Sequence, residues 1–287
     1  MKASDGLELR LHQFGDSHQP GVLMLHGLGQ TGQAWHGAAQ ALAALGYYVV
    51  CPDFRGHGSS DWSPTGTYCL TDFLQDVRDQ LGLFVSPPVV VGASMGGLLG
   101  LLAEAESPQA LCRALVLVDI TPRWERQGVE RILAFMRAAP HGFDSLDAAA
   151  EAIAGHLPHR SPQRANRRLE RMLVEKSDGR WYWHWDPQLL DQIESQSEHY
   201  PQRLLAAARV LTQPVLLVSG QHSDVVSSET IDEFLGAVPH ARHVDIARAT
   251  HMVAGDNNDA FNQAVMSFLT DLPGLASKQA EPSPVSA

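Results

Sequence analysis

Ser94 stands in GASMG (92–96), a GxSxG pattern that in enzymes presents a serine hydroxyl as a nucleophile. It follows the apolar run PVVVG and precedes the helical pattern MGGLLGLLAEAE. A strand that runs directly into a helix forms a sharp turn, and such a turn would expose the hydroxyl at the carboxyl end of a sheet. Gly92, Gly96 and Gly97 leave room for this crowding. The helix start would also direct N–H groups and its positive dipole end toward a developing anion.

The same glycines permit other interpretations. Gly92, Gly96 and Gly100 recur at the small-xxx-small spacing of packed membrane helices. However, the apolar run is only about 15 residues long between Pro88 and Glu104, and a membrane span needs about 20. A remaining alternative is that the small residues only let a helix pack closely on a strand.

A serine hydroxyl needs a neighbouring base, and His251 is the best candidate among fourteen histidines. It follows the last strand pattern, ARHVDIARATH, and precedes the final helical pattern, so we expect it on a loop at the carboxyl end of the sheet. Other histidines lie in polar surroundings where a solvated side chain is expected, or in a long insertion. The first group is His12, His18, His240 and His243, and the second is His141, His156 and His159.

An acid should hold the histidine in the correct tautomer. Asp224 follows the strand pattern PVLLVSG by four residues, in the loop GQHSDVV, and we predict that it is this acid. Asp119 is the alternative acid, because it ends the strand pattern ALVLVD; it could instead cap the segment TPRWE. The chain order Ser94, Asp224, His251 differs from the orders of the chymotrypsin and subtilisin types.

Two N–H donors are needed to stabilise an oxyanion. The residue after the nucleophile, Met95, is one expected donor. The early loop in VLMLHGLGQTG provides the other, Leu28, because Gly27 and Gly29 let the backbone turn sharply there. His26 lies in this turn, and we expect it to brace the loop through hydrogen bonds rather than act as a base.

The elements that must position these residues alternate along the chain. Short Val- and Leu-rich runs predict buried parallel strands, and segments with helical spacing lie between most of them, which favours an α/β fold. The strand runs are 22–26, 47–53, 88–92, 114–119, 214–220 and 241–246. The interval from Asp119 to Pro214 lacks such a run and looks mainly helical, so we expect an insertion there.

The insertion contains the aromatic cluster WYWHW (181–185) and an arginine stripe. Aromatic side chains can line an apolar substrate pocket, or they can join the insertion to the core. The substrate-binding candidates are Trp35, Trp124, Trp181, Trp183 and Trp185, with alternation placing the last three on one face. The arginines at 160, 164, 167, 168 and 171 predict a solvated helix face, and anion recognition is the alternative.

The composition limits the classes of partner. With 21 Lys and Arg against 32 Asp and Glu, the net charge of -11 makes a nucleic-acid partner unlikely. The three cysteines show neither a disulfide framework nor metal-ligand spacing, and we see no secretory signal. We therefore expect a cytoplasmic enzyme without a membrane span, with no metal or organic cofactor.

Together these segments resemble the α/β-hydrolase superfamily, in the branch with a cap domain between core strands six and seven. The matching segments are HGLGQTGQAW (26–35), PDFRGHGSSD (52–61), GASMGG (92–97), SGQHSDVV (219–226) and ATHMVAGDNNDAF (249–261). The resemblance implies a mostly parallel twisted sheet flanked by helices, with a mainly helical cap after core strand 6. We expect the core at 1–121 and 211–272, the cap at 122–210 and a disordered tail at 273–287.

Ser94 separates the chain from relatives with an aspartate nucleophile, such as haloalkane dehalogenases and soluble epoxide hydrolases. The resemblance therefore implies a carboxylesterase that acts on a small-molecule ester through an acyl-enzyme intermediate, and a homodimer is possible. Alternatives on the same residues are a C–C bond hydrolase of ring-cleavage products, a perhydrolase, a lactonase and a thioesterase. A ligand receptor on a hydrolase scaffold is a further alternative from another class.

Overall fold

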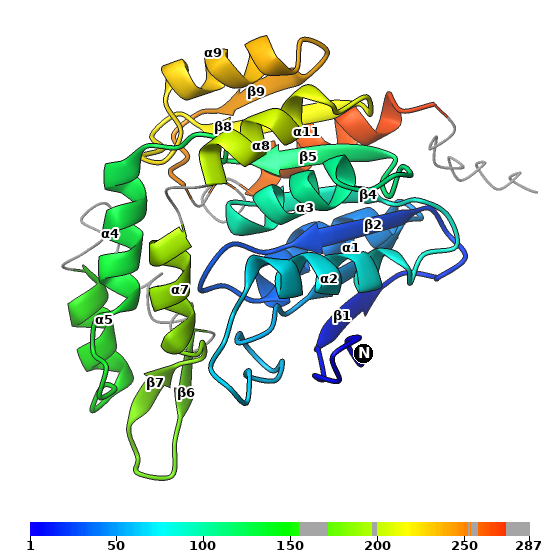
Figure 1. Ribbon diagram of the computed structural model, residues 1–287. Coiled ribbons are helices and arrows are strands. Elements are labelled where there is room, and N and C mark those ends of the chain that lie inside the picture. The colour runs from blue at the N-terminus through cyan, green and yellow to red at the C-terminus, as the bar shows by residue number, and fades with distance from the viewer. Residues whose placement is uncertain (155–171, 197–199, 252, 254–257, 274–287) are drawn as a thin grey trace, which may run out of the picture.

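A seven-stranded sheet forms the centre of the molecule, which is described by a computed structural model (Figure 1). The structure describes residues 1–154, 172–196, 200–251, 253 and 258–273. The strand order is β1-β3-β2-β4-β5-β8-β9, and every neighbouring pair is parallel except β1 with β3. The strands are β1 (Leu11–Phe14), β2 (Gly21–Leu25), β3 (Tyr48–Pro52), β4 (Val89–Ala93), β5 (Ala114–Val118), β8 (Val215–Gly220) and β9 (Arg242–Ile246).

The central strands are buried along their whole length because both faces of the sheet are covered. Every residue of β2, β3, β5 and β8 is buried, as expected for parallel strands between helical layers. All six predicted runs form strands, but β9 lies at the edge of the sheet and only its Ile246 is buried. Strand β1 was not predicted, because its four residues LHQF are mostly half-buried at the sheet edge and form no continuous apolar run.

Helices cover both faces of the sheet (Figure 1). One face carries α1 (His36–Ala44) and α11 (Asn258–Thr270), and the other carries α2 (Leu70–Leu81), α3 (Met95–Ala105), α8 (Tyr200–Arg209) and α9 (Ser228–Ala237). A short 3-10 helix, η1 (Gly32–Trp35), precedes α1. Successive residues of β2 alternate between the two layers, with Leu23 in one core and Met24 in the other. The α/β architecture inferred from the sequence is confirmed.

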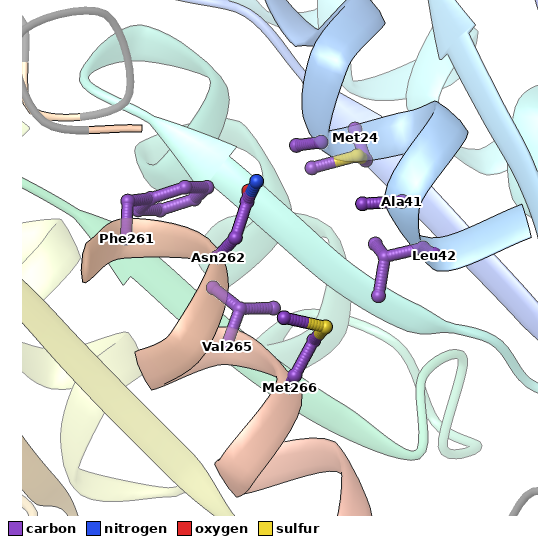
Figure 2. Close-up of a pocket in the computed structure, with 8 residues that line it drawn as sticks. Met24, Ala41, Leu42, Phe261, Asn262, Val265 and Met266 are labelled. Carbon is purple, nitrogen blue, oxygen red and sulfur yellow. The ribbon is translucent and has the colours of Figure 1, made fainter. Parts of the chain in front are cut away.

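Figure 2 shows an apolar hollow where α1 and α11 meet over β2. Its lining is Met24, Ala38, Ala41, Leu42, Phe261, Asn262, Val265 and Met266. Since none of the candidate site residues belongs to this lining, the hollow is a feature of helix packing and not of the site.

The long insertion lies between β5 and β8. Its described elements are α4 (Arg126–Met136), α5 (Leu146–Ala154), β6 (Leu173–Glu175), β7 (Trp181–Trp183), α7 (Gln188–Gln196) and α8. Strands β6 and β7 form an antiparallel hairpin, which adds strand structure to an insertion expected to be mainly helical. Leu133, Met136, Phe143, Trp183 and Trp185 belong to a hydrophobic core of the insertion's own.

The last helix of the insertion behaves differently from the others. In Figure 1, α4, α5, α7 and the hairpin stand together at one side, whereas α8 lies against the main body. It packs on α3 and α9, and its Leu204 belongs to the core beneath those helices. The expected boundary at residue 210 therefore includes a helix that packs with the main body. The arginine stripe and nearly all of the expected tail lie outside the described residues.

Candidate active site

Ser94 sits on a strained turn between β4 and α3. Its backbone angles are φ 47° and ψ −119°, a region that side-chain-bearing residues rarely adopt. The turn is fixed by the Ser94 N–H, which donates to the Val118 carbonyl at 3.0 Å, and by the Gly97 N–H, which donates to the Ser94 carbonyl at 2.9 Å. The strand therefore ends where its neighbour β5 also ends, and the serine is held at that edge.

The glycines around Ser94 are required by close backbone contacts. A Cβ atom on Gly92 would lie 2.5 Å from the carbonyl carbon of Gly96, and one on Gly96 would lie 2.5 Å from the Leu25 carbonyl oxygen. A Cβ on Gly97 would lie 2.8 Å from the Gly92 carbonyl oxygen. These contacts support the interpretation of the glycine spacing as a crowded strand-to-helix turn.

Asp119 is the carboxylate that contacts His251. The distance from His251 Nδ1 to Asp119 Oδ2 is 2.7 Å, and the Asp119 side chain is fully buried. Asp119 directly follows β5, and because Ala93 pairs with Val118, it stands beside Ser94 in the register of the sheet. A carboxylate on Nδ1 favours the tautomer with its proton there, which leaves Nε2 as an acceptor.

Further donors fix the Asp119 carboxylate. Gly220 N–H donates to its Oδ1 at 2.8 Å, and the Ser223 hydroxyl donates to Oδ2 at 2.5 Å. The Asp119 backbone has φ 50°, and its N–H donates to the Val218 carbonyl at 2.7 Å. Ser223 was not predicted as a site residue, although it stands next to Asp224 in the loop GQHSDVV.

The prediction that Asp224 is the acid is therefore corrected. Its carboxylate is 46% exposed and pairs with Arg131 of α4 at 2.9 Å. The backbone explains this placement, since Glu125 N–H donates to the Val225 carbonyl at 2.8 Å, and a Cβ on Gly128 would meet the Asp224 carbonyl oxygen. The insertion thus packs directly on the loop that carries Asp224, and the carboxylate is used in that contact.

The loop after β2 holds the N–H groups on either side of Leu28. Gly27 N–H donates to the Gln30 side-chain oxygen at 3.0 Å, and Gly29 N–H donates to His57 Nε2 at 3.2 Å. Among the residues that the structure describes, neither Leu28 N–H nor Met95 N–H donates to another protein group. Gly27 packs against Ser94, since a Cβ on Gly27 would lie 3.3 Å from the serine Cβ. Leu28 and Met95 thus remain the two candidate oxyanion donors.

His26 braces the loop, as the sequence analysis expected. Its Nδ1 lies 2.7 Å from the Gly27 carbonyl, and Phe54 N–H donates to its Nε2 at 2.9 Å. Burial is the main reason that its pKa lies well below the usual histidine value, with the neighbouring His57 as the next cause. The neutral ring that results can accept the Phe54 hydrogen bond.

Two histidines that were expected in solvent are partly buried. His12 Nε2 lies 3.2 Å from Asp53 Oδ1, with a side chain that is 19% exposed. His243 Nε2 lies 2.8 Å from the Ser219 hydroxyl, and burial lowers its pKa. The same hydroxyl donates to Asp245, so it is not poised as a second nucleophile.

The tryptophans separate into different environments. Trp35 is buried in the core against Phe261, so its prediction as a substrate-binding residue is corrected. Trp183 and Trp185 stack with ring centroids 4.6 Å apart, and Trp185 reaches the loop after β2, where a Cβ on Gly29 would lie 3.4 Å from its ring. Trp181 packs at the edge of the insertion's core, and Trp124 packs on the main core. Trp185 is therefore the tryptophan for which we find a contact beside the site.

In the part of the chain that the structure describes, no group of three or more His, Cys, Asp or Glu side chains is arranged to hold a metal ion. No helix in that part of the chain is long and apolar enough to cross a membrane.

Comparison with known proteins identifies the family. The family model described as alpha/beta hydrolase fold matches residues 20–258. The chain belongs to this family and is a hydrolase.

Characterised relatives and solved structures match along most of the chain. A 3-hydroxybutyrate-oligomer hydrolase of Cupriavidus necator is 30% identical over 256 residues, which cover 84% of this chain and 85% of that protein. The sn-1-specific diacylglycerol lipase ABHD11 of Mus musculus is 29% identical over 270 residues, covering 89% and 82%. The crystal structure of an alpha/beta hydrolase from Novosphingobium aromaticivorans is 27% identical with a TM-score of 0.77, covering 93% and 95%.

Proposed function

We propose that this hydrolase cleaves carboxylic esters through an acyl-enzyme intermediate. Ser94 is the nucleophile, His251 is the general base and Asp119 is the acid that orients it. Leu28 and Met95 N–H groups stabilise the oxyanion. Asp119 takes the place that the sequence analysis gave to Asp224.

In the first half of the reaction, His251 Nε2 removes the hydroxyl proton while Ser94 Oγ attacks the acyl carbon. The oxygen of the tetrahedral intermediate accepts hydrogen bonds from the two backbone N–H groups. His251 then protonates the departing alcohol, and the acyl group stays on the serine. Throughout, the Asp119 carboxylate stabilises the positively charged imidazolium.

In the second half, a water molecule replaces the alcohol. His251 removes a proton from the water as the water oxygen attacks the acyl carbon, and it returns that proton to Ser94 Oγ when the ester bond to the serine breaks. The carboxylic acid leaves, and the enzyme regains its starting protonation state.

The contact between Asp119 and His251 is the observation that carries this proposal. The fully buried Asp119 carboxylate is fixed by hydrogen bonds from Gly220 and Ser223 and lies 2.7 Å from His251 Nδ1, which is the arrangement that orients a catalytic histidine. The nearby strained Ser94 turn and two available N–H groups complete the set that acyl transfer requires. The relatives named a lipase and a 3-hydroxybutyrate-oligomer hydrolase support an ester substrate.

We further propose that the insertion up to α7 acts as the cap and contributes a wall of the acyl pocket. Leu28 packs against its hydrophobic core, and Met136 and Trp185 face Gly29. These apolar side chains favour an uncharged acyl group beside the oxyanion loop.

Labelling with a fluorophosphonate tests the nucleophile. The reagent should attach to Ser94, as located by mass spectrometry, and Ser94→Ala should abolish both the adduct and the hydrolysis of p-nitrophenyl esters. An adduct that persists in the variant would identify another nucleophile. Labelling of Ser94 with turnover of a ring-cleavage product, but not of any ester, would replace ester cleavage with C–C hydrolysis.

A further inference from the structure

Three buried histidines that take no part in the proposed proton transfers lie in a row beside the oxyanion loop. The ring centroids of His26 and His57 are 5.2 Å apart, and those of His57 and His184 are 6.3 Å apart. His26 belongs to the loop after β2, His57 to the loop after β3, and His184 to the insertion, directly after β7. The row therefore joins the oxyanion loop to the cap.

His57 holds the residue next to Leu28. Its Nδ1 lies 3.0 Å from the Arg55 carbonyl, to which only an N–H can donate, so Nε2 is the unprotonated nitrogen. Gly29 N–H donates to this Nε2 at 3.2 Å. Burial lowers the pKa of His57 to about 3, so that the ring stays neutral and can accept this bond at physiological pH.

The position of Leu28 N–H depends on its fixed neighbours. On one side, Gly27 is held through its carbonyl by His26 and through its N–H by the Gln30 side chain. On the other side, Gly29 has φ 70° and is held by His57. The Leu28 N–H belongs to the peptide unit between Gly27 and Leu28, and the next unit carries the Gly29 N–H that His57 holds. Loss of the His57 bond therefore releases one of the two ends that fix the direction of the Leu28 N–H.

His184 connects the cap to the same loop as His57. Its Nδ1 accepts a hydrogen bond from Gly58 N–H at 2.9 Å, one residue after His57. The Nε2 atom is then the protonated nitrogen, and it is buried without a hydrogen-bond partner among the described residues. Burial lowers the pKa of His184 to about 4, an effect that Asp53 and the backbone of Gly29 partly oppose.

Contacts with Asp53 fix the loop after β3, which carries His57 and Gly58. Asp53 accepts hydrogen bonds from Gly32 N–H at 2.8 Å and from Ser59 N–H at 3.0 Å. Gly58 has φ 58°, and a Cβ there would lie 2.3 Å from the Asp53 carboxylate. Gly58 is therefore closely confined, and a shift of Gly58 would also shift the adjoining His57.

Additional bonds seat the cap on this loop. Asp186 N–H donates to the Gly56 carbonyl at 2.9 Å, and the Tyr68 hydroxyl donates to the Asp186 carboxylate at 2.6 Å. Since Gly56, His57 and Gly58 are consecutive, the cap forms hydrogen bonds to the residues on both sides of His57.

We propose that His57 is a positioning residue for the oxyanion donor Leu28, and that His184 makes its position depend on the seating of the cap. The role of Leu28 rests on the proposed ester hydrolysis. The link from His184 through Gly58 and His57 to Gly29 does not, and it is measurable without substrate.

The test compares His57→Phe, His57→Gln and His184→Phe with Glu104→Ala as a matched control. Glu104 is a buried side chain at the far end of α3 that accepts hydrogen bonds from Leu111 N–H and Cys112 N–H, so its loss weakens the fold away from the loop. Two readouts are used well below the melting temperature: hydrogen exchange of the Gly29 amide by NMR, and kcat and KM for p-nitrophenyl esters.

We expect His57→Phe to lower kcat about 10- to 100-fold with little change in KM, because a misdirected donor weakens transition-state binding. His57→Gln keeps an acceptor and should recover part of that loss. In His57→Phe and His184→Phe the Gly29 amide should exchange at least about tenfold faster, as local opening becomes easier. Glu104→Ala should lower stability but leave kcat and Gly29 exchange unchanged.

The outcomes separate the claims. A kcat in His57→Phe within about twofold of the wild type, with the variant folded, would overturn the positioning role. Unchanged Gly29 exchange in His184→Phe would overturn the link to the cap. If the wild type neither hydrolyses esters nor reacts with a fluorophosphonate, the proposed function fails, and the Gly29 exchange rates still decide the link.

Discussion

His251 Nδ1 and Asp119 Oδ2 lie 2.7 Å apart although 132 residues separate them in the chain. The contact exists because β5, β8 and β9 are parallel neighbours in the sheet, so that the loop after β5 and the loop after β9 leave the same edge. Asp119 follows β5 directly, whereas Asp224 lies four residues beyond β8, where the cap reaches it. The distance along the loop therefore decides which carboxylate faces the histidine.

The crowded turn at Ser94 predicts how a substitution at Gly96 changes the free energy of unfolding. Gly96→Ala should lower the free energy of unfolding by about 3 kcal/mol, at the upper end for overpacking, because a Cβ would lie 2.5 Å from the Leu25 carbonyl oxygen. Urea unfolding measures this. Gly236→Ala in α9 is the matched control, since a Cβ there meets nothing within 4 Å, and it should stabilise by about 0.5–1 kcal/mol. Equal effects at the two glycines would contradict this account of the turn.

A buried ion pair predicts a large loss of stability when one partner is removed, and a smaller loss when apolar residues replace both partners. Arg55 donates to both oxygens of Asp76, each at 2.6 Å, and the Asp76 side chain is fully buried. Asp76→Ala should cost about 3–5 kcal/mol, because it leaves a buried guanidinium without its main partner. The double variant Arg55→Met, Asp76→Leu should recover at least half of that loss in urea unfolding. If the double variant is less stable than Asp76→Ala, desolvation of the charge is not the cause.

The buried histidines predict how stability depends on pH. The pKa of His57 is about 3 and that of His184 about 4 in the folded protein, against about 6.5 in the unfolded chain. Between these values the unfolded chain binds protons that the folded protein does not. The stabilisation from these neutral histidines is therefore fully present above about pH 6.5. The free energy of unfolding falls as the pH drops toward 4, by up to about 1.4 kcal/mol per pH unit for each histidine.

Urea unfolding from pH 7.5 to pH 5 checks this dependence. The midpoint should fall with pH, and His184→Phe should show a shallower slope than the wild type because one proton-binding difference is removed. A midpoint that is constant or rises toward pH 5 would show that the histidines are not buried in the neutral form.

The sequence predicted most of the fold because its signals are local. Buried parallel strands form continuous apolar runs, and GASMGG records the crowding at Ser94 in its own glycines. The edge strand β1 lacked such a run and was missed. His26 could be assigned as a brace because it stands inside the turn that it holds.

The remaining errors concern contacts between distant segments. Asp119 and Asp224 both follow strands of the sheet, and only the strand order and the docking of α4 distinguish them. Trp35 stands next to the oxyanion loop in the sequence, but η1 turns it into the core against Phe261. His57 and His184 could not be linked from the sequence, because 126 residues separate His184 from Gly58, its hydrogen-bond partner.

The most direct measurement compares the kcat of Asp119→Asn and Asp224→Asn for p-nitrophenyl ester hydrolysis, with folding of both verified by thermal melting. Asp119→Asn should lose about a thousandfold or more, because His251 loses its orienting charge. Asp224→Asn should stay within about threefold of the wild type, since an exposed ion pair contributes at most about 1 kcal/mol. A large loss in Asp224→Asn with near-normal turnover in Asp119→Asn would contradict the assignment of Asp119 as the acid.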